Sequence, residues 1–460
     1  MALDIFPYQA DGAQFLAARP RAGLLDKPGV GKTAQVVRAT DLRGSARGWI
    51  TCPAVAREHW RGEFDKFGLQ KRKVCKGVTI HDFVAWAHGH FDVMVTSYEL
   101  AARWAQHLHE RCEPLDFMVF DEAHYLKNDG AKRSKLLLGP ESDGAYGAVQ
   151  WAQQAWWLTG TPVPNDPIDI FTFLRFQNVM PLNKRDFSRR YFTSRPTTYG
   201  SVQRAKPEMA PELRSLIANN SICRTLDEVG IQLPPIFITT YLVDGNTDEV
   251  RRALLEHPGL DKAIIDALES DKGIAGIDAP HVATLRRLIG EAKAVPYAAT
   301  LLGELESGLD KIVVFAHHRS TLATVRDYLM KHNIRCCLID GSTSERDRMA
   351  AIANFQGDPE MRVVLANIRA AGTALTLTAA CHLDMLESDW APASNYQAIK
   401  RVHRLTQTRS VRARLITLAN SFDVQVNKLV AAKTAAVGEL DIASSHDAAE
   451  HMPSMEEMLR

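Results

Sequence analysis

Residues 22–33 read Ala-Gly-Leu-Leu-Asp-Lys-Pro-Gly-Val-Gly-Lys-Thr, an apolar run that passes through a glycine-rich turn into a helical pattern. The apolar residues 22–25 predict a strand, and the residues from Lys32 onward predict a helix. Gly29 and Gly31 let the backbone wrap closely around an anion, to which the helix N-terminus presents its amide hydrogens. The stretch therefore predicts a phosphate-binding loop between a strand and a helix, which is typical of an α/β protein.

The side chains of this loop have definite expected roles. The Lys32 ammonium group is suited to the β- and γ-phosphates of ATP, and the Thr33 hydroxyl is suited to ligate Mg²⁺. The remaining cradle residues are Pro28, Gly29, Val30 and Gly31. One departure stands out, because the common pattern begins with Gly and this chain has Asp26 there. Some helicase-type ATPases have a residue other than Gly at this position, so Asp26 favours that class and is compatible with a phosphate-binding loop.

An acidic pair completes the expected phosphate site. The apolar run 117–120 predicts a strand and ends in Asp121-Glu122-Ala123-His124. In a nucleotide site Asp121 would hold Mg²⁺ through water, and Glu122 would orient and deprotonate the attacking water. A surface acidic pair is the alternative reading, and the phosphate loop upstream disfavours it.

A third element, Leu158-Thr159-Gly160-Thr161-Pro162, follows the strand predicted over 155–158. The hydroxyl groups of Thr159 and Thr161 are candidates for coupling the acidic pair to a nucleic-acid groove. As an isolated turn this element would carry no functional meaning.

The second half of the chain holds two further elements. A loop containing Gly372 follows a predicted strand, and the stretch 397–407 places Arg401 and Arg404 three residues apart. That spacing puts both arginines on one face of a predicted helix. Two arginines aimed together suit a γ-phosphate, although a solvated basic face stays open as the alternative.

Short apolar runs alternate with helical patterns in both halves, which predicts α/β architecture with parallel sheets. Strands are expected over 22–25, 48–52, 92–96, 117–120, 155–158, 311–315, 334–339, 362–366, 382–386 and 412–418, and helices over, for example, 320–331 and 344–356. The residues with expected chemistry follow strand ends, where open α/β sheets place ligands. Residues 166 to about 301 differ, with a mostly helical pattern broken by prolines.

Composition excludes several classes. The chain of 460 residues is 46% hydrophobic and 24% charged, as in globular proteins, and its length predicts two or three domains. No apolar run approaches the roughly 20 residues of a membrane span, and the N-terminus does not resemble a signal peptide, so we expect a cytoplasmic protein.

The seven cysteines form no Cys-x-x-Cys pair, which disfavours a zinc site. The net charge of +1 leaves nucleic-acid binding open, because a local basic lining suffices.

Taken in order, phosphate loop, acidic box, Thr-Gly-Thr, Gly-loop and paired arginines resemble helicase superfamily two, and the finer motifs resemble its Swi/Snf-type branch. The finer motifs are Pro7-Tyr8-Gln9, Cys52-Pro53-Ala54 with Trp60, Thr96-Ser97-Tyr98-Glu99, Tyr125-Leu126-Lys127-Asn128 followed by Lys132-Arg133, Asp340-Gly341-Ser342-Thr343, and Arg401-Val402-His403-Arg404 leading to Gln407. Gly290-Glu291-Ala292-Lys293 and Phe315-Ala316-His317-His318 look most like the annealing-helicase (HARP-like) subgroup. The resemblance covers residues 5 to about 432.

The resemblance implies two RecA-like lobes with ATP and Mg²⁺ in the cleft between them, and an ATPase that translocates along double-stranded or branched DNA. It implies that Gln9 contacts adenine and that Arg401 and Arg404 reach the γ-phosphate, while Gly372 lies in a nucleotide-binding loop. Residues expected to couple hydrolysis to DNA are Ser97, His124, Thr159, Thr161 and Gln397.

Two departures from the branch leave these roles intact. Lys27-Pro28 follows Asp26 where the branch has Glu-Met, and Leu405-Thr406 stands where it has Ile-Gly. No accessory zinc or histone-reading motif is present in the sequence, so the chain resembles a bare motor, more bacterial or viral than chromatin-associated, and nuclear if eukaryotic. We expect a monomer.

The expected domains are a first lobe at 1–240 with a helical protrusion from about 165, a helical connector at 241–294, a second lobe at 295–432 and a tail at 433–460. Two alternatives remain open. One is a strand-separating DNA or RNA helicase, and the other is a nucleic-acid-binding scaffold with an inactive ATPase site.

Overall fold

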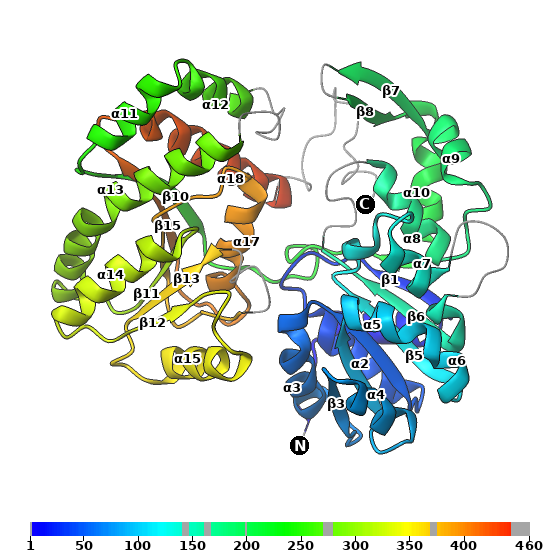
Figure 1. Cartoon of the computed structure of the whole chain (residues 1–460). Helices are drawn as coiled ribbons and strands as arrows, with labels where there is room; N and C mark the ends of the chain where they lie inside the picture. Colours follow the sequence, from blue (N-terminus) through cyan, green and yellow to red (C-terminus); the bar gives the residue numbers. More distant parts are fainter. Residues whose placement is uncertain are drawn as a thin grey trace. The chain divides into compact units, whose positions relative to one another are not determined.

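The computed structural model describes residues 2–139, 147–160, 167–197, 200–269, 279–368 and 375–442. The chain divides into two compact units between Ile231 and Gln232. Each unit is built on its own parallel sheet, as the alternation of strand and helix patterns predicted (Figure 1). None of the described helices is both long and apolar enough to cross a membrane.

The first unit contains a seven-stranded sheet in the order β3-β4-β2-β5-β6-β1-β9, and every pairing in it is parallel. Its strands are β1 (Arg21–Leu24), β2 (Gly48–Cys52), β3 (Val74–Gly77), β4 (Val93–Ser97), β5 (Leu115–Asp121), β6 (Ala152–Leu158) and β9 (Ser221–Ile222). Its helices are α1 (Pro7–Ala17), α2 (Lys32–Leu42), α3 (Arg57–Phe67), α4 (Ile80–Ala87), α5 (Tyr98–Trp104), α6 (Leu108–Arg111), α7 (Lys132–Leu138), α8 (Ile170–Phe176), α9 (Lys184–Tyr191) and α10 (Ala210–Ala218).

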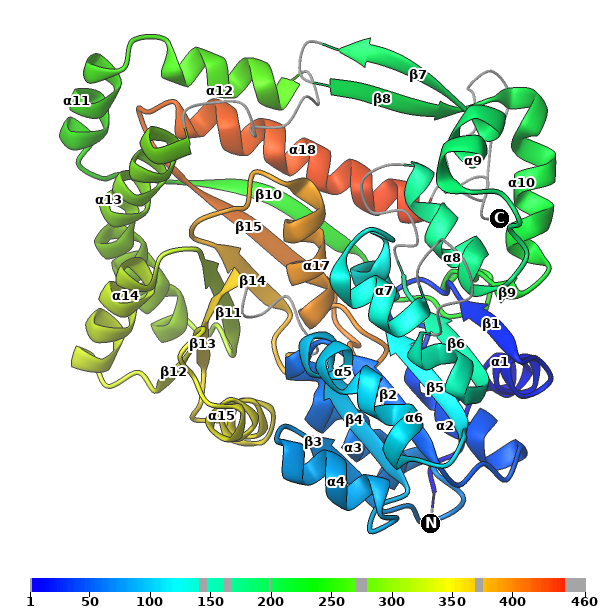
Figure 2. The same ribbon diagram turned by 45° about the vertical axis from the view of Figure 1, so that its right-hand side comes forward.

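The central strands of this sheet are buried on both faces, and Figure 2 shows α5, α6 and α7 in front of it. A core cluster rich in aromatic residues, including Trp49, Phe120 and Trp157, fills the space between the sheet and its helices. An antiparallel hairpin of β7 (Phe192–Thr197) and β8 (Gly200–Ala205) extends from this unit.

The second unit contains a six-stranded parallel sheet in the order β10-β15-β14-β11-β13-β12. Its strands are β10 (Ile236–Val243), β11 (Ile312–Ala316), β12 (Cys336–Ile339), β13 (Val363–Asn367), β14 (His382–Met385) and β15 (Val411–Leu418). Its helices are α11 (Asp248–Glu256), α12 (Leu260–Glu269), α13 (Ala279–Glu306), α14 (Arg319–Lys331), α15 (Glu345–Gly357), α17 (Pro392–Val402) and α18 (Asp423–Ile442).

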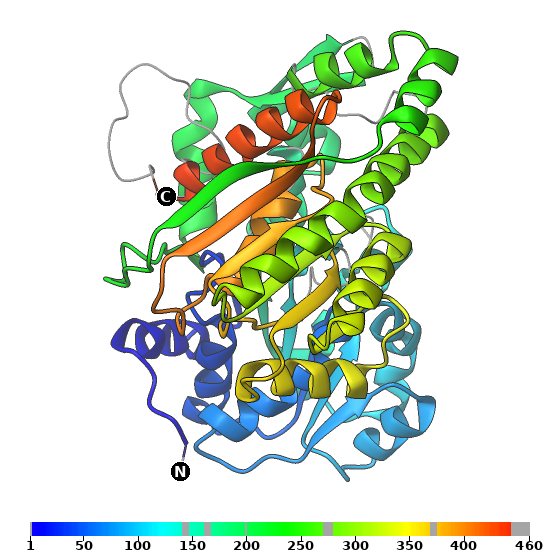
Figure 3. The same ribbon diagram turned by 90° about the vertical axis from the view of Figure 1, so that its left-hand side faces the viewer.

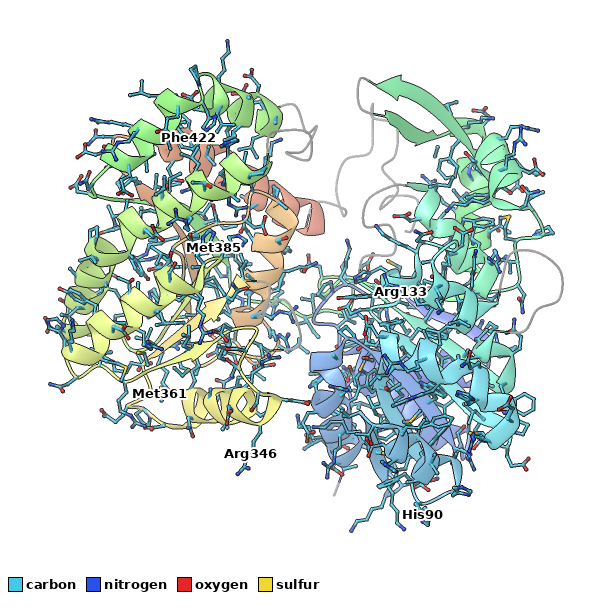
Figure 4. The ribbon with its side chains drawn as sticks, viewed as in Figure 1. His90, Arg133, Arg346, Met361, Met385 and Phe422 are labelled. Atoms are coloured by element: carbon cyan, nitrogen blue, oxygen red, sulfur yellow. The ribbon has the colours of Figure 1, made fainter. Side chains whose placement is uncertain are left out.

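Alternate residues of the central strand β11 enter two different cores. Val314 packs with residues of α13 and α14, whereas Phe315 packs with residues of α17 and α18. Figure 3 shows α13 crossing the near face of this sheet, and Figure 4 labels Met385, which is buried at the end of β14. Burial on both faces explains why these strands have continuous apolar sequences.

Every strand that the sequence predicted is present, most with ends shifted along the chain. The stretch expected to be mostly helical, from 166 to about 301, also contains β7, β8, β9 and β10. β10 pairs with β15 along its whole length, so the expected boundary at residue 240 falls inside a strand of the second sheet. The helices expected to form a separate connector at 241–294 instead share the core of the second unit, through Val250, Ile264 and Leu285. Their apolar faces are buried there because a short helix alone cannot cover them.

Candidate functional site

The predicted phosphate loop lies between β1 and α2, at the carboxyl end of its strand. Gly29 and Gly31 have φ values of 96° and 86°. Both values lie in the left-handed region, which costs energy for residues with a Cβ atom. Gly31 is the N-cap of α2, so the free amides of the first helical turn face the loop, as a bound phosphate requires.

Lys32 is the first residue of α2, and its Nζ donates to the backbone carbonyl of Asp26 over 2.7 Å. Burial raises the pKa of Asp121, and the Lys32 charge partly opposes that rise. Thr33 follows on the same helical turn and is partly exposed, as are the outer residues of the loop. The Val30 side chain is buried and anchors the loop.

Asp121 ends β5, and its carboxylate is held by two donors. Trp60 Nε1 donates to Oδ2 over 2.8 Å, and the backbone amide of Glu122 donates to Oδ1 over 3.0 Å. Burial, and then the neighbouring Glu122 charge, raise the pKa of Asp121 to about 6. The Trp60 hydrogen bond and the Lys32 charge oppose that rise. A buried carboxyl group with a perturbed pKa beside a second carboxylate is typical of a functional site.

Glu122 has a φ of 51°, an unusual conformation for a residue with a side chain, and it begins the short helical turn Ala123–Leu126. His124 connects this residue to the third motif. Its Nδ1 lies 3.1 Å from Thr159 Oγ1 and 3.3 Å from Glu122 Oε2. The acidic box and Thr159 therefore form one polar chain, while Thr161 lies outside the described residues.

The third motif also touches the phosphate loop. A Cβ atom added at Gly160 would lie 2.8 Å from Cδ of Pro28. Since β1 and β6 are adjacent strands, their carboxyl ends bring the two loops together. Three segments that are far apart in the sequence thus meet at one edge of the first sheet, as their positions after strand ends predicted.

Gln9 of α1 lies directly against the phosphate loop. Its Nε2 donates to the Val30 carbonyl over 3.1 Å, and its Oε1 accepts from the Phe6 amide over 3.0 Å. The side chain is buried, and a Cβ atom at Gly31 would lie 2.2 Å from Gln9 Nε2. Through these contacts α1 packs directly against the phosphate loop. The contact of Gln9 with adenine stays a prediction.

Ser97, at the end of β4, is the N-cap of α5, and its Oγ accepts from the Leu100 amide over 3.4 Å. Capping explains why this side chain is buried, so its role in coupling to DNA stays a prediction.

Two residues of this site carried no functional role in the sequence analysis. Arg224 forms a bidentate ion pair with the fully buried Asp26, at 2.7 Å between Nη2 and Oδ2 and 3.1 Å between Nε and Oδ1. In the sequence, Asp26 stands out only as a departure from Gly. No sequence signal pointed to Arg224, because it lies far along the chain and meets Asp26 only through the pairing of β1 with β9.

The paired arginines lie in the second unit, and the expectation that they share one helical face is wrong. α17 ends at Val402, so Arg401 is in its last turn and Arg404 lies beyond the helix. Arg404 Nη1 donates to Thr376 Oγ1 over 2.8 Å, and its Nε donates to the Lys400 carbonyl over 3.3 Å. The last carbonyls of the helix have partners outside it, because the Arg401 carbonyl accepts from the Leu377 amide over 2.9 Å and the Val402 carbonyl accepts from the buried Gln407 Nε2 over 3.3 Å.

Gln397 is exposed on α17, as a residue that touches a nucleic acid would be. Gly372 lies outside the described residues. The contributions of Gln397 and Gly372 stay predictions.

The oxygen ligands of the first unit fit Mg²⁺. Hydroxyl and carboxylate oxygens, such as those of Thr33 and Asp121, are its preferred protein ligands, and Mg²⁺ in phosphate sites is held by one or two of them together with phosphate and water. Within the described part of the chain no three His, Cys, Asp or Glu side chains form a cluster that could hold a metal without such help.

Two domain families match this chain. Residues 8–252 match the SNF2-related domain, and residues 296–406 match the helicase conserved C-terminal domain. The chain is 27% identical to the SWI/SNF-related matrix-associated actin-dependent regulator of chromatin subfamily A-like protein 1 of Drosophila melanogaster, over 92% of this chain and 54% of that protein. It is 28% identical to the DNA annealing helicase and endonuclease ZRANB3 of Homo sapiens, over 91% of this chain and 39% of that protein.

The chain therefore spans about half or less of the length of these relatives. Among solved structures, it is similar to the Sulfolobus solfataricus SWI2/SNF2 ATPase core in complex with dsDNA, with 19% identity, 96% of each chain covered and a TM-score of 0.43. The matched SNF2-related domain contains the phosphate loop, the acidic box and the Thr-Gly-Thr motif, and the matched helicase domain contains both arginines. Together these findings confirm the resemblance seen in the sequence: the chain belongs to the SNF2-related family of helicase-type ATPases.

Proposed function

We propose that this protein is a DNA-dependent ATPase that uses ATP hydrolysis to move along duplex or branched DNA. The observation that carries the proposal is the meeting of the phosphate loop, the acidic box and the third motif at the carboxyl ends of β1, β5 and β6, where Glu122, His124 and Thr159 form a polar chain. This arrangement has a cation for the phosphates, a carboxylate for a metal, a carboxylate for water and a connection leading away from them.

Each residue of the first unit has a definite part in this chemistry. Lys32 and the amides of the first turn of α2 hold the phosphates, and Gln9 contacts the base. Glu122 accepts the proton of the attacking water. When bound at Thr33 and Asp121, Mg²⁺ would neutralise charge on the phosphates.

Arg401 and Arg404 of the second unit contribute the remaining charge. Guanidinium groups suit the γ-phosphate because their planar forks match its oxygens. In this proposal ATP binding brings the arginines to the γ-phosphate, and hydrolysis releases them. The cycle moves the two units relative to a DNA backbone, which is gripped mainly at its phosphates and without strong sequence preference.

His124 and Thr159 connect the water-activating carboxylate to the third motif. We assign them, with Ser97, Thr161 and Gln397, to communication between hydrolysis and DNA. The names of two relatives refer to chromatin regulation and DNA annealing, which supports DNA as the substrate of this chain.

One panel tests the proposal: steady-state ATPase activity of the full chain with single-stranded DNA, double-stranded DNA, forked DNA and RNA of matched length. We expect duplex or forked DNA to stimulate most, with an apparent affinity that falls steeply as salt rises, because phosphate contacts release counterions. Equal stimulation by RNA would favour a general helicase, which a strand-displacement assay on a tailed duplex would then identify. No hydrolysis with any nucleic acid would show an inactive binding protein.

A further inference from the structure

Arg224 connects three segments of the first unit around the phosphate loop. Besides the bidentate pair with Asp26, its Nη1 donates to the Tyr8 carbonyl over 2.6 Å and its Nη2 to Gln35 Oε1 over 2.6 Å. Tyr8 precedes the predicted adenine contact, and Gln35 is in α2, where Gln35 Nε2 also donates to Asp26 over 3.0 Å. One guanidinium group thus holds α1, the start of the loop and α2 in a fixed relation.

The backbone around Arg224 strengthens this connection. The amide of Leu25 donates to the Ile222 carbonyl over 2.7 Å, and the amide of Lys27 donates to the Arg224 carbonyl over 2.9 Å. Beyond Arg224, the Leu226 side chain lies 3.7 Å from the position a Cβ atom would take at Gly29. The segment that follows β9 is therefore hydrogen-bonded along the phosphate loop.

The same segment continues out of the first unit. After Ile231 the chain enters the second unit, and Pro234 and Pro235 lead into β10. There the Pro234 carbonyl lies 2.7 Å from His403 Nε2, and the Pro235 carbonyl accepts from the Val411 amide over 2.9 Å. His403 is buried, and in the sequence it lies between Arg401 and Arg404. The far end of the segment is therefore hydrogen-bonded to the arginine motif.

We propose that residues 224–235 form a coupling strap, with Arg224 as a positioning residue for the phosphate loop and His403 as its anchor in the arginine motif. The inference rests on the proposed function, because it deepens the way in which the nucleotide loop and Arg401 and Arg404 act together. Each anchor lies inside its own unit. A change in the phosphate loop on nucleotide binding pulls on Arg224, and the strap delivers that change to the backbone beside His403.

If the ion pair between Arg224 and Asp26 only stabilised the first unit, the length of the segment that follows Arg224 would not matter for activity. The first test therefore lengthens the strap and leaves both anchors in place. Four residues, Gly-Ser-Gly-Ser, are inserted after Gln232, which is exposed and lies between the two anchors. The matched control carries the same insertion after Gly89, whose surroundings are open.

We expect the insertion after Gln232 to lower DNA-stimulated ATP hydrolysis by about tenfold, a size typical of coupling between sites, while ADP affinity stays within about twofold of wild type. The control insertion should leave both quantities unchanged. Full DNA stimulation in the lengthened strap would overturn the proposal.

A second test does not depend on hydrolysis. Hydrogen exchange of the peptide covering residues 225–235 is measured with and without ADP. We expect ADP to slow exchange there in the wild type and in Arg47→Lys, whose arginine also donates to carbonyls of the first unit but away from this loop. In Arg224→Lys the response should disappear, because lysine keeps the charge and lacks the fork.

The two tests separate the possible failures. A wild-type chain that binds ADP but shows no DNA-stimulated hydrolysis refutes the proposed function, and the exchange experiment still decides the strap. An unchanged ADP response in Arg224→Lys, or no response in a wild type that binds ADP, would show that Arg224 is a structural ion pair only.

Discussion

At the scale of single residues, the proposed roles separate ATP binding from ATP hydrolysis. Glu122→Gln removes the base and keeps the cradle, so we expect turnover to fall by at least about 100-fold with ATP affinity retained. Lys32→Ala should lose both, because in the proposed site its ammonium group holds the phosphates. Steady-state ATPase assays with DNA, together with a fluorescent ATP titration, measure the two effects. Glu113→Gln, an exposed change, is the control. DNA-stimulated turnover in Glu122→Gln would remove the role assigned to Glu122.

His403 gives a pH dependence with a definite sign. Burial, and then the nearby Lys400 charge, lower the pKa of His403 from 6.5 to about 4. A lowered pKa means that the unfolded chain binds the proton more readily. The stability due to neutral His403 is therefore complete above pH 6.5 and is lost as the pH falls toward 4, by at most about 3 kcal/mol.

We therefore expect His403→Gln, which keeps a donor for the Pro234 carbonyl but does not titrate, to flatten this dependence. The measurement is hydrogen exchange of the β15 peptide at pH 7 and pH 5, in wild type and variant at the same pH. His332→Gln, an exposed change in the same unit, is the control. Equal responses of wild type and His403→Gln to acidification would show that His403 does not carry the effect.

At the scale of elements, the turn from β1 into α2 depends on a glycine for two separate reasons. Gly31 has a left-handed φ, and a Cβ atom there would collide with Gln9 of α1. Gly44 also has a left-handed φ, of 64°, but nothing lies within 4 Å of its Cβ position. Gly31→Ala introduces both backbone strain and a collision with Gln9, whereas Gly44→Ala introduces backbone strain alone. Comparing the two variants therefore separates the effect of strain from the effect of the collision.

We expect Gly31→Ala to weaken ATP binding by about tenfold or more, since strain of this kind costs about 1–3 kcal/mol before the collision is added. Gly44→Ala should reduce stability slightly and leave ATP affinity unchanged. Isothermal titration with ATP, alongside thermal unfolding, measures both. Similar ATP affinities in the two variants would mean that the contact between the loop and Gln9 has no part in binding.

At the scale of the whole molecule, the proposed mechanism requires residues of both units to act on one triphosphate. A residue that acts in the transition state is not replaced by more DNA, so Arg404→Ala should lose turnover by about 10³-fold even at saturating DNA. We expect the same for Arg401→Ala. Arg409→Ala, which removes an exposed arginine paired with Asp310, should keep its activity. ATPase titrations with DNA decide the matter, since full rescue would make these arginines DNA contacts.

The sequence alone was sufficient for the two parallel sheets, the phosphate loop, the acidic box and the family. These features depend on local signals: apolar runs set the strands, and glycines with a following Lys-Thr set the loop. Some strands were missed, for different physical reasons. β9 has only two residues, so its pairing with β1 defines it more than its own sequence does. β10 is rich in β-branched and aromatic residues, which favour a strand, but it lies in a stretch whose pattern is otherwise mostly helical.

Only the tertiary structure decided which polar groups meet. The sequence placed Arg401 and Arg404 on one helix, but α17 ends at Val402, whose carbonyl accepts a hydrogen bond from the buried Gln407 amide. It recorded Asp26 as a mismatch, whereas the fold pairs that buried carboxylate with Arg224. A local pattern cannot anticipate such pairs, because a buried charge needs its partner in space and the chain is free to supply that partner from any distance along the sequence.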